Sequence, residues 1–400
     1  RSGLEEGLTE KEVNLYADPR FDWEQMAQIR YGLERDLGEE DIRLYSDPKF
    51  TREQMQEIRL GLEDRLKEKQ IKLYADKKLH YVQMAQIREG LQKGLTEEQV
   101  KLYADPMFAS IQMEQIKLGL KNGLSMEEVN LYADPKFNGY QMAEIRKGLE
   151  NRLTEEQIKL YTDSKFDWKQ MHEIRYGLEE GLTEEQVKLY ANQRFDSRQM
   201  KEIRKGLEHE LKEEQIKLYA DSKFDWEQME QIRDGLEKKL SIEKVKLFAD
   251  QKFGWLEMYE IKKGLENGLS IEQVKLYANE NFDGTQMKEI RKGLEDGLSE
   301  KEIELYAIPK IEKLDMEKIR YAILNGLDKD IIKKFVNGEY NLGQMYELGE
   351  GLQNGLDNKQ INIFSNPKFS VDQMREVRLG LKKGLNIEKV KLYADIKINA

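Results

Sequence analysis

The chain has 400 residues, of which 36% are charged, and its formal net charge is −11. It contains no cysteine, which excludes disulfides, zinc–thiolate sites and cysteine nucleophiles and fits a reducing, cytoplasmic compartment. No apolar stretch approaches the roughly 20 residues that cross a bilayer, so we expect no membrane partner.

One unit of 29 residues repeats along the sequence without insertion or deletion. Its register is marked by one aromatic column: Tyr16, Tyr45, Tyr74, Tyr103, Tyr132, Tyr161, Tyr190, Tyr219, Phe248, Tyr277, Tyr306, Phe335, Phe364 and Tyr393. Such a period is typical of solenoids, whose units bury their apolar faces only against their neighbours. We therefore predict an all-α fold, an α-solenoid superhelix of two-helix tandem repeats. Residues 1–400 would form a single array of about 13 repeats, with no β-sheet and no separate domain.

Both ends of the sequence fall inside a repeat. Residues 1–8 match the end of a unit, with Leu8 in the column of Leu37, and the sequence stops soon after Tyr393. We interpret the chain as a piece excised from a longer protein, with residues 1–2 as a candidate cloning scar.

Residues 154–183 illustrate the first helix of a unit. Thr154 and Gln157 form a capping box, which marks a helix start. We predict a first helix of about nine residues that ends near Ser164. The column of Ser164 holds all six prolines of the chain, which cannot continue a helix: Pro19, Pro48, Pro106, Pro135, Pro309 and Pro367.

A second helix of about 12 residues follows in each unit. Asp167 is its predicted N-cap and Gln170 closes a second capping box. It ends near Gly181, whose column is glycine in eight of thirteen units. A further glycine recurs inside this helix, as at Gly177, and Ala322 is the exception. Because a mid-helix glycine costs about 1 kcal/mol relative to alanine, we expect another element to approach closely there.

Eight apolar columns form the predicted core. In this unit they are Ile158, Leu160, Tyr161, Phe166, Met171, Ile174, Leu178 and Leu182.

The units differ mainly on the face of the second helix opposite its core residues, where spacings of four residues align the variable columns. All four tryptophans of the chain fall in the first of these columns. An unconstrained solvated face explains its Ser, Lys and Glu residues. The aromatic residues favour a ligand-contact surface, since Trp, Tyr and Arg are common interface anchors. The candidate ligand-binding residues are Trp23, Tyr31, Arg52, Tyr81, Tyr140, Trp168, His172, Tyr176, Arg198, Trp226, Trp255 and Tyr259.

A column of cations borders this variable face and is broken only at Gly349. One interpretation is a structural salt bridge to an Asp or Glu of the next unit, and the other is a ladder that tracks phosphates. The column contains Arg30, Arg59, Arg88, Lys117, Arg146, Arg175, Arg204, Arg233, Lys262, Arg291, Arg320 and Arg378.

Catalysis and metal binding have little support in the sequence. The three histidines, His80, His172 and His209, occupy unrelated columns, and no hydrolase triad or metalloprotease motif occurs. We expect no enzyme activity, catalytic residue, metal, cofactor or small-molecule substrate.

The unit Y-A-D-P-K-F-D-W-x-Q-M-x-x-I-R-x-G-L-E-x-G-L resembles tandem repeats on very large proteins of conjugative elements and phages in gut Firmicutes. There they accompany antirestriction-like and other polyvalent domains. The resemblance spans the whole chain, but L-T-E-E-Q-V-K-L-Y stands here where the family often has a shorter L-D-V-S-x-Y. It implies a mobile-element setting.

We predict a non-enzymatic scaffold that binds a protein or peptide through the variable face. The alternative is a modular nucleic-acid reader with one repeat per base and the cations on phosphates. The acidic net charge of −11 weighs against the alternative, because nucleic-acid binders normally carry a basic surface.

Overall fold

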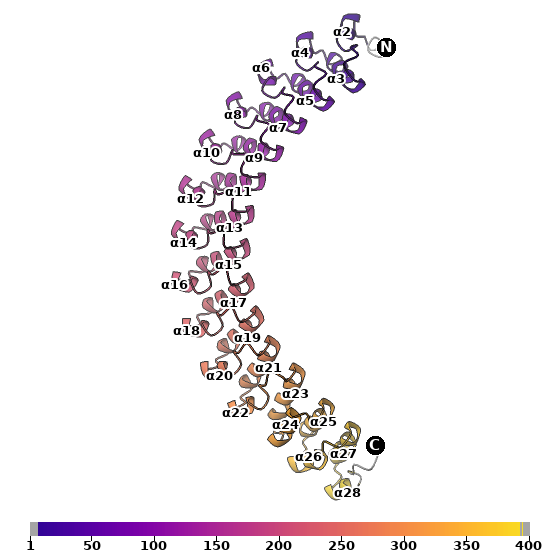
Figure 1. The fold of residues 1–400 in the computed structure, drawn as a ribbon, viewed down its shortest axis with the longest axis vertical. Coiled ribbons are helices and arrows are strands. Elements are labelled where there is room, and N and C mark those ends of the chain that lie inside the picture. Colours follow the sequence, from indigo (N-terminus) through magenta and orange to yellow (C-terminus); the bar gives the residue numbers. More distant parts are fainter. Residues whose placement is uncertain (1–6, 393, 395–400) are drawn as a thin grey trace. The chain divides into compact units, whose positions relative to one another are not determined.

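The computed structural model describes residues 7–392 and 394. Within these residues it has 27 helices and no strand, which confirms the predicted all-α repeat solenoid (Figure 1). The predictions for residues 1–2 and Tyr393 lie outside the described residues. Contacts divide the chain into two compact units, Arg1–Arg204 (unit 1) and Lys205–Ala400 (unit 2), with the division inside α15 (Ser197–Glu208). No helix of the described chain combines the length and the apolar character needed to span a bilayer.

Each repeat contributes a short helix and a long helix. The long helices of unit 1 are α3 (Trp23–Leu33), α5 (Arg52–Glu63), α7 (Tyr81–Gln92), α9 (Ser110–Lys121), α11 (Gly139–Glu150) and α13 (Trp168–Glu179). Its short helices are α2 (Glu10–Asn14), α4 (Glu39–Arg43), α6 (Glu68–Ile71), α8 (Glu97–Lys101), α10 (Met126–Asn130), α12 (Glu155–Lys159) and α14 (Glu184–Lys188).

Unit 2 repeats this alternation. Its long helices are α17 (Trp226–Glu237), α19 (Trp255–Glu266), α21 (Gly284–Glu295), α23 (Lys313–Leu324), α25 (Leu342–Gln353) and α27 (Val371–Lys382). Its short helices are α16 (Glu213–Ile216), α18 (Ile242–Val245), α20 (Ile271–Lys275), α22 (Glu300–Ile303), α24 (Lys329–Val336), α26 (Asn358–Phe364) and α28 (Ile387–Lys391).

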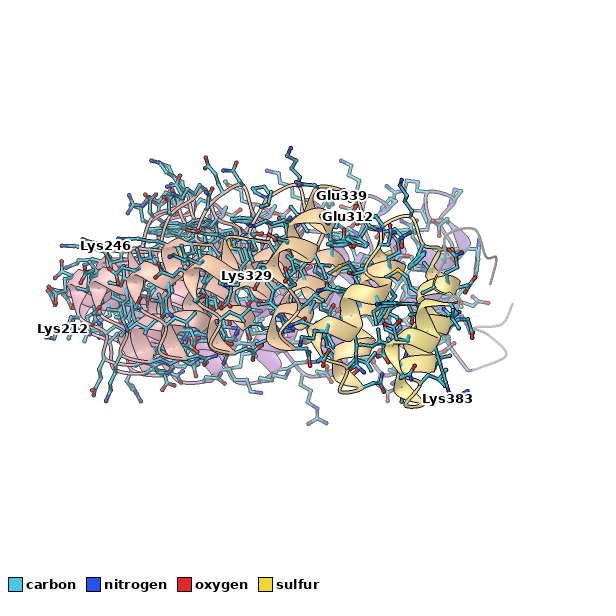
Figure 2. All side chains as sticks on the ribbon, turned by 90° about the horizontal axis from the view of Figure 1, so that it is seen from below. Lys212, Lys246, Glu312, Lys329, Glu339 and Lys383 are labelled. Carbon is cyan, nitrogen blue, oxygen red and sulfur yellow. The ribbon has the colours of Figure 1, made fainter. Side chains whose placement is uncertain are left out.

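Within each unit, long helices pack on long helices and form one row, and the short helices form a second row beside it (Figure 1). Polar side chains cover the outside of the short-helix row. Lys212 and Lys246, which flank α16 and α18, are exposed there and point away from the ribbon (Figure 2). The variable face predicted from the sequence lies on the long-helix row and is separate from this polar edge.

The first helix of most repeats is shorter than predicted. In the illustrated repeat it covers only Glu155–Lys159, and the predicted nine residues are wrong. Its end tightens because the N–H groups of Leu160 and Tyr161 bond to carbonyls three residues back, each at 3.2 Å. An Asx turn follows, in which the Lys165 N–H donates to the Asp163 carboxylate at 3.0 Å.

Seven of the eight predicted core columns are buried in this repeat, and Leu160 is not. Leu160 is half-buried, because the tightened turn directs the following Tyr161 into the core instead. Tyr161 has no exposed surface, and burial raises the pKa of its hydroxyl well above the ordinary value. The tyrosine that marks the repeat is thus a neutral, fully buried core residue.

In most repeats the glycine inside the long helix makes room for this tyrosine. A Cβ added at Gly148 would overlap the Tyr161 hydroxyl, and the same holds for Gly177 and Tyr190. The predicted close approach therefore exists, and it is made by a side chain of the next short-helix segment. Ala322, the exception, stands in a repeat whose tyrosine column holds Phe335 and so lacks the hydroxyl.

Both capping boxes are confirmed in the illustrated repeat. The Thr154 N–H donates to Gln157 Oε1 at 2.9 Å, and the Asp167 N–H donates to Gln170 Oε1 at 2.8 Å. The long helices end in a left-handed residue, which is usually glycine, such as Gly181 with φ +92°. Where glycine is absent, other residues adopt this conformation, with φ between 61° and 70°: Asp36, Arg65, Arg152, Glu210 and Lys239.

Candidate ligand-binding surface

Glutamine side chains fix the spacing of successive long helices. Gln170 uses its oxygen to cap its own helix and donates from Nε2 to the Phe195 carbonyl of the next repeat at 2.7 Å. Gln141 makes the same contact with the Phe166 carbonyl at 2.7 Å. The sequence predicted the cap but not this hydrogen bond to the next repeat. The preference for Gln over Glu in this column is a signal for it, because only the Gln side chain can donate a hydrogen bond.

The cations of the ladder are buried or half-buried and are paired inside the fold. Arg175 donates from Nε to Glu144 Oε2 at 2.9 Å, and a second ion pair joins it to Glu179 on its own helix. Burial alone would raise the pKa of Glu144, but hydrogen bonds from Lys147 and Arg175 hold it below its ordinary value. The same Nε contact joins Arg291 to Glu260 at 2.8 Å in unit 2.

The acceptor lies in the preceding repeat, 31 residues back, rather than in the next repeat as predicted. Some repeats use an amide at this position, as in the contact of Arg59 Nε with Gln28 Oε1 at 3.1 Å. A guanidinium held by two partners beneath the surface has few donors left for a ligand phosphate. This geometry supports the structural interpretation of the ladder.

The twelve candidate ligand residues lie along the long-helix row, on its variable face. Ten of them are exposed, and Trp226 and His172 are half-buried. Trp23 is 77% exposed and Tyr140 is 60% exposed, which leaves large aromatic surfaces in contact with water. We call four columns of the long helices the variable stripe: the first and second residues of each helix, and the residues four and eight positions after the first.

Residues of the variable stripe contact each other across repeats at a spacing of 28 residues. Arg52 donates to Glu24 at 2.7 Å, and the rings of Tyr140 and Trp168 lie 5.9 Å apart. Ile111 covers Gly139 so closely that a Cβ there would lie 2.8 Å from it. Part of the variation therefore matches neighbouring helices to each other. Comparing residues 28 apart in the sequence would have revealed these pairs.

Some stripe aromatics also pack on ladder cations of the following repeat. The Arg204 guanidinium lies 4.6 Å from the ring centre of Tyr176, and the Arg59 guanidinium lies 5.8 Å from that of Tyr31. These tyrosines support the ladder on one face and remain exposed on the other. Tyr140 and Trp168 contact each other and no ladder cation in the described contacts.

The histidines have structural partners, within the same helix start for His80 and in a neighbouring repeat for His172 and His209. His80 Nδ1 accepts from the Val82 N–H at 3.4 Å at the start of α7, and His209 contacts Glu237 at 2.8 Å. His172 lies between Glu144 and Arg175. Within residues 7–392 and 394, no group of three or more His, Cys, Asp or Glu residues has metal-binding geometry.

A scan against protein-family models finds no match to this sequence, and a search of curated proteins finds no relative. The resemblance to mobile-element repeats therefore stays a prediction.

Proposed function

We propose that this chain is a non-enzymatic scaffold that binds a protein or peptide through the variable stripe. The observation that carries the proposal is the run of exposed apolar residues on three successive long helices: Ile111 of α9, Tyr140 of α11 and Trp168 of α13. Adjacent exposed aromatic residues lower the solubility of a protein and are typical of interaction sites. The cysteine-free sequence fits action in the cytoplasm, and the motif resemblance suggests a mobile-element setting.

The surroundings of this run favour an acidic ligand. On α11 and α13 the variable stripe carries Lys147, Lys169 and His172 and no acidic residue. Lys147 and His172 already contact Glu144, so the preference for an acidic ligand depends on Lys169. Lys169 also lies 5.6 Å above the ring of Trp168, so charge and apolar surface adjoin each other. A peptide that combines acidic and apolar side chains would satisfy both features.

A nucleic-acid reader is a weaker proposal because its phosphate contacts would have to come from the ladder. Two members of the ladder, Arg175 and Lys262, are only 6% and 3% exposed. Arg175 is paired with Glu144, and Lys262 donates to Gln231. Free phosphate-binding cations would have to be found elsewhere on an acidic chain.

The test is a selection from a displayed random-peptide library on the full chain. The comparison is a variant in which the four tryptophans, Trp23, Trp168, Trp226 and Trp255, are replaced by alanine. Met107, which is 72% exposed outside the variable stripe, provides the matched control Met107→Ala. We expect selected peptides to bind the native and control chains and to lose affinity for the tryptophan variant. Equal affinity for all three chains, with unchanged helicity, would overturn the proposal.

A further inference from the structure

The ladder has one gap, and an open cavity of about 280 Å³ lies at that gap. Gly349 of α25 stands where the other repeats place an arginine or lysine. A Cβ added at Gly349 would meet only the Tyr321 ring, at 3.9 Å, so a longer side chain has room there. The cavity lies between α23 and α25, within unit 2.

Two tyrosines of the variable stripe line this cavity. In other repeats, tyrosines of the same two columns contact cations of the ladder. Tyr321 shares its column with Tyr176, which carries the Arg204 guanidinium at 4.6 Å. Tyr346 shares its column with Tyr259, which lies 5.5 Å from the Lys262 ammonium. The aromatic surfaces that receive a cation in other repeats are thus present, and the chain supplies no cation at position 349.

The charges of the lining decide between a cationic and an anionic ligand. Glu317, Lys318 and Glu350 line the cavity. In the described part of the chain none of the three has an ion-pair partner, and the Glu350 carboxylate accepts a hydrogen bond from Asn354 Nδ2 at 3.4 Å. Arg320 also lines it, but this guanidinium is already bonded to Glu289 and Asp296 at 3.2 and 2.6 Å. The unpaired charges therefore sum to one negative charge, and the Gln353 amide adds an acceptor where other repeats place the second carboxylate of the ladder.

We propose that this cavity binds a guanidinium group, the side chain of an arginine in a peptide ligand. The planar group would lie against Tyr321 and Tyr346 and donate to Glu317, Glu350 and Gln353. This inference rests on the proposed function, because the cavity opens on the variable stripe. Lys318 occupies the column that is Glu or Gln in the other repeats, and its charge weakens the site without filling it.

The test uses the full chain with ¹³C-methyl methionine, because Met345 lines the cavity and is 2% exposed. The probes are the tripeptides acetyl-Gly-Arg-Gly-amide, its citrulline analogue and acetyl-Gly-Glu-Gly-amide. We expect the arginine probe to shift the Met345 methyl resonance, with the citrulline probe weaker by about tenfold or more. Gly349→Arg restores the regular ladder and should abolish the shift, whereas Lys318→Glu should tighten binding by about tenfold.

Three results would overturn the proposal: no Met345 shift in either the native or the Lys318→Glu chain, equal binding of arginine and citrulline probes, or stronger binding of the glutamate probe. These results leave the proposed function intact if library peptides still depend on the tryptophans. Loss of both would show that the proposed function itself is wrong.

Discussion

The packing of a buried tyrosine against a mid-helix glycine predicts the effect of Gly148→Ala. The new Cβ would overlap the Tyr161 hydroxyl and lie 2.9 Å from Ile158 Cδ1. Overpacking of this kind costs about 1–3 kcal/mol, offset by about 1 kcal/mol of helix propensity that alanine gains over glycine. The net cost is about 0–2 kcal/mol, and we expect the upper half of this range, about 1–2 kcal/mol, because the fully buried tyrosine has little freedom to move away.

Most of this cost should disappear when the hydroxyl is removed, although the contact with Ile158 Cδ1 remains. In the described part of the chain Tyr161 Oη has no hydrogen-bond partner, so Tyr161→Phe alone should be neutral or stabilising. Gly148→Ala with Tyr161→Phe reproduces the natural pairing of Ala322 with Phe335. The double variant should therefore be close to the native chain in stability, with a coupling free energy of about 1–2 kcal/mol.

The assay is native-state amide hydrogen exchange of α11 and α12, because a repeat array need not unfold in one step. Gly148→Ala should speed exchange there about 5- to 30-fold. Gly235→Ala is the control, because its repeat has Phe248 in place of a tyrosine. The new Cβ would lie 2.9 Å from Phe248 Cζ, so we expect a smaller acceleration than for Gly148→Ala rather than none. Equal acceleration by Gly148→Ala with and without Tyr161→Phe would refute the reasoning.

Three further predictions concern the helix ends, the contacts between repeats and the buried tyrosines. Arg152→Gly should stabilise the end of α11 by about 1 kcal/mol, because Arg152 holds φ +70°, and Gly181→Arg should destabilise the end of α13 by a similar amount. Hydrogen exchange measures both effects. No change in either variant would contradict the left-handed conformation assigned to these helix ends. Gln170→Glu keeps the cap but loses the donor to the Phe195 carbonyl, and it should cost about 1–3 kcal/mol, whereas loss only in Gln170→Ala would assign the effect to the cap. Raising the pH above the ordinary tyrosine pKa of 10.0 should unfold the chain. Burial raises the pKa of Tyr161, so the stability that is present below pH 10 is lost as the pH rises. Tyrosinate absorbance that appears before the circular dichroism changes would contradict this prediction.

The sequence predicted what depends on local chemistry. The caps at Thr154 and Asp167 and the helix stop at Gly181 follow from hydrogen bonds and backbone preferences within a few residues. The mid-helix glycine also indicated a close approach, although its partner, a tyrosine of the next segment, was not identified.

Other features depend on contacts between repeats, which local patterns do not specify. The first helix is short because Tyr161 turns into the core, and a helical apolar pattern over the same residues gave no sign of that turn. The second hydrogen bond of Gln170 and the direction of the Arg175 ion pair required knowledge of which repeat faces which. The variable stripe was located correctly on the long helices, but its internal pairing was missed.

The central claim is that ligand contacts lie on the variable stripe, and single-cysteine labelling tests it most directly because the native chain has no cysteine. Lys169→Cys places an environment-sensitive fluorophore on the variable stripe of α13, and Lys159→Cys places it at a position on the short helix α12 that is also exposed. On titration with a peptide from the library selection, we predict a saturable fluorescence change at position 169 and none at position 159. A change at position 159 with none at position 169 would contradict the claim.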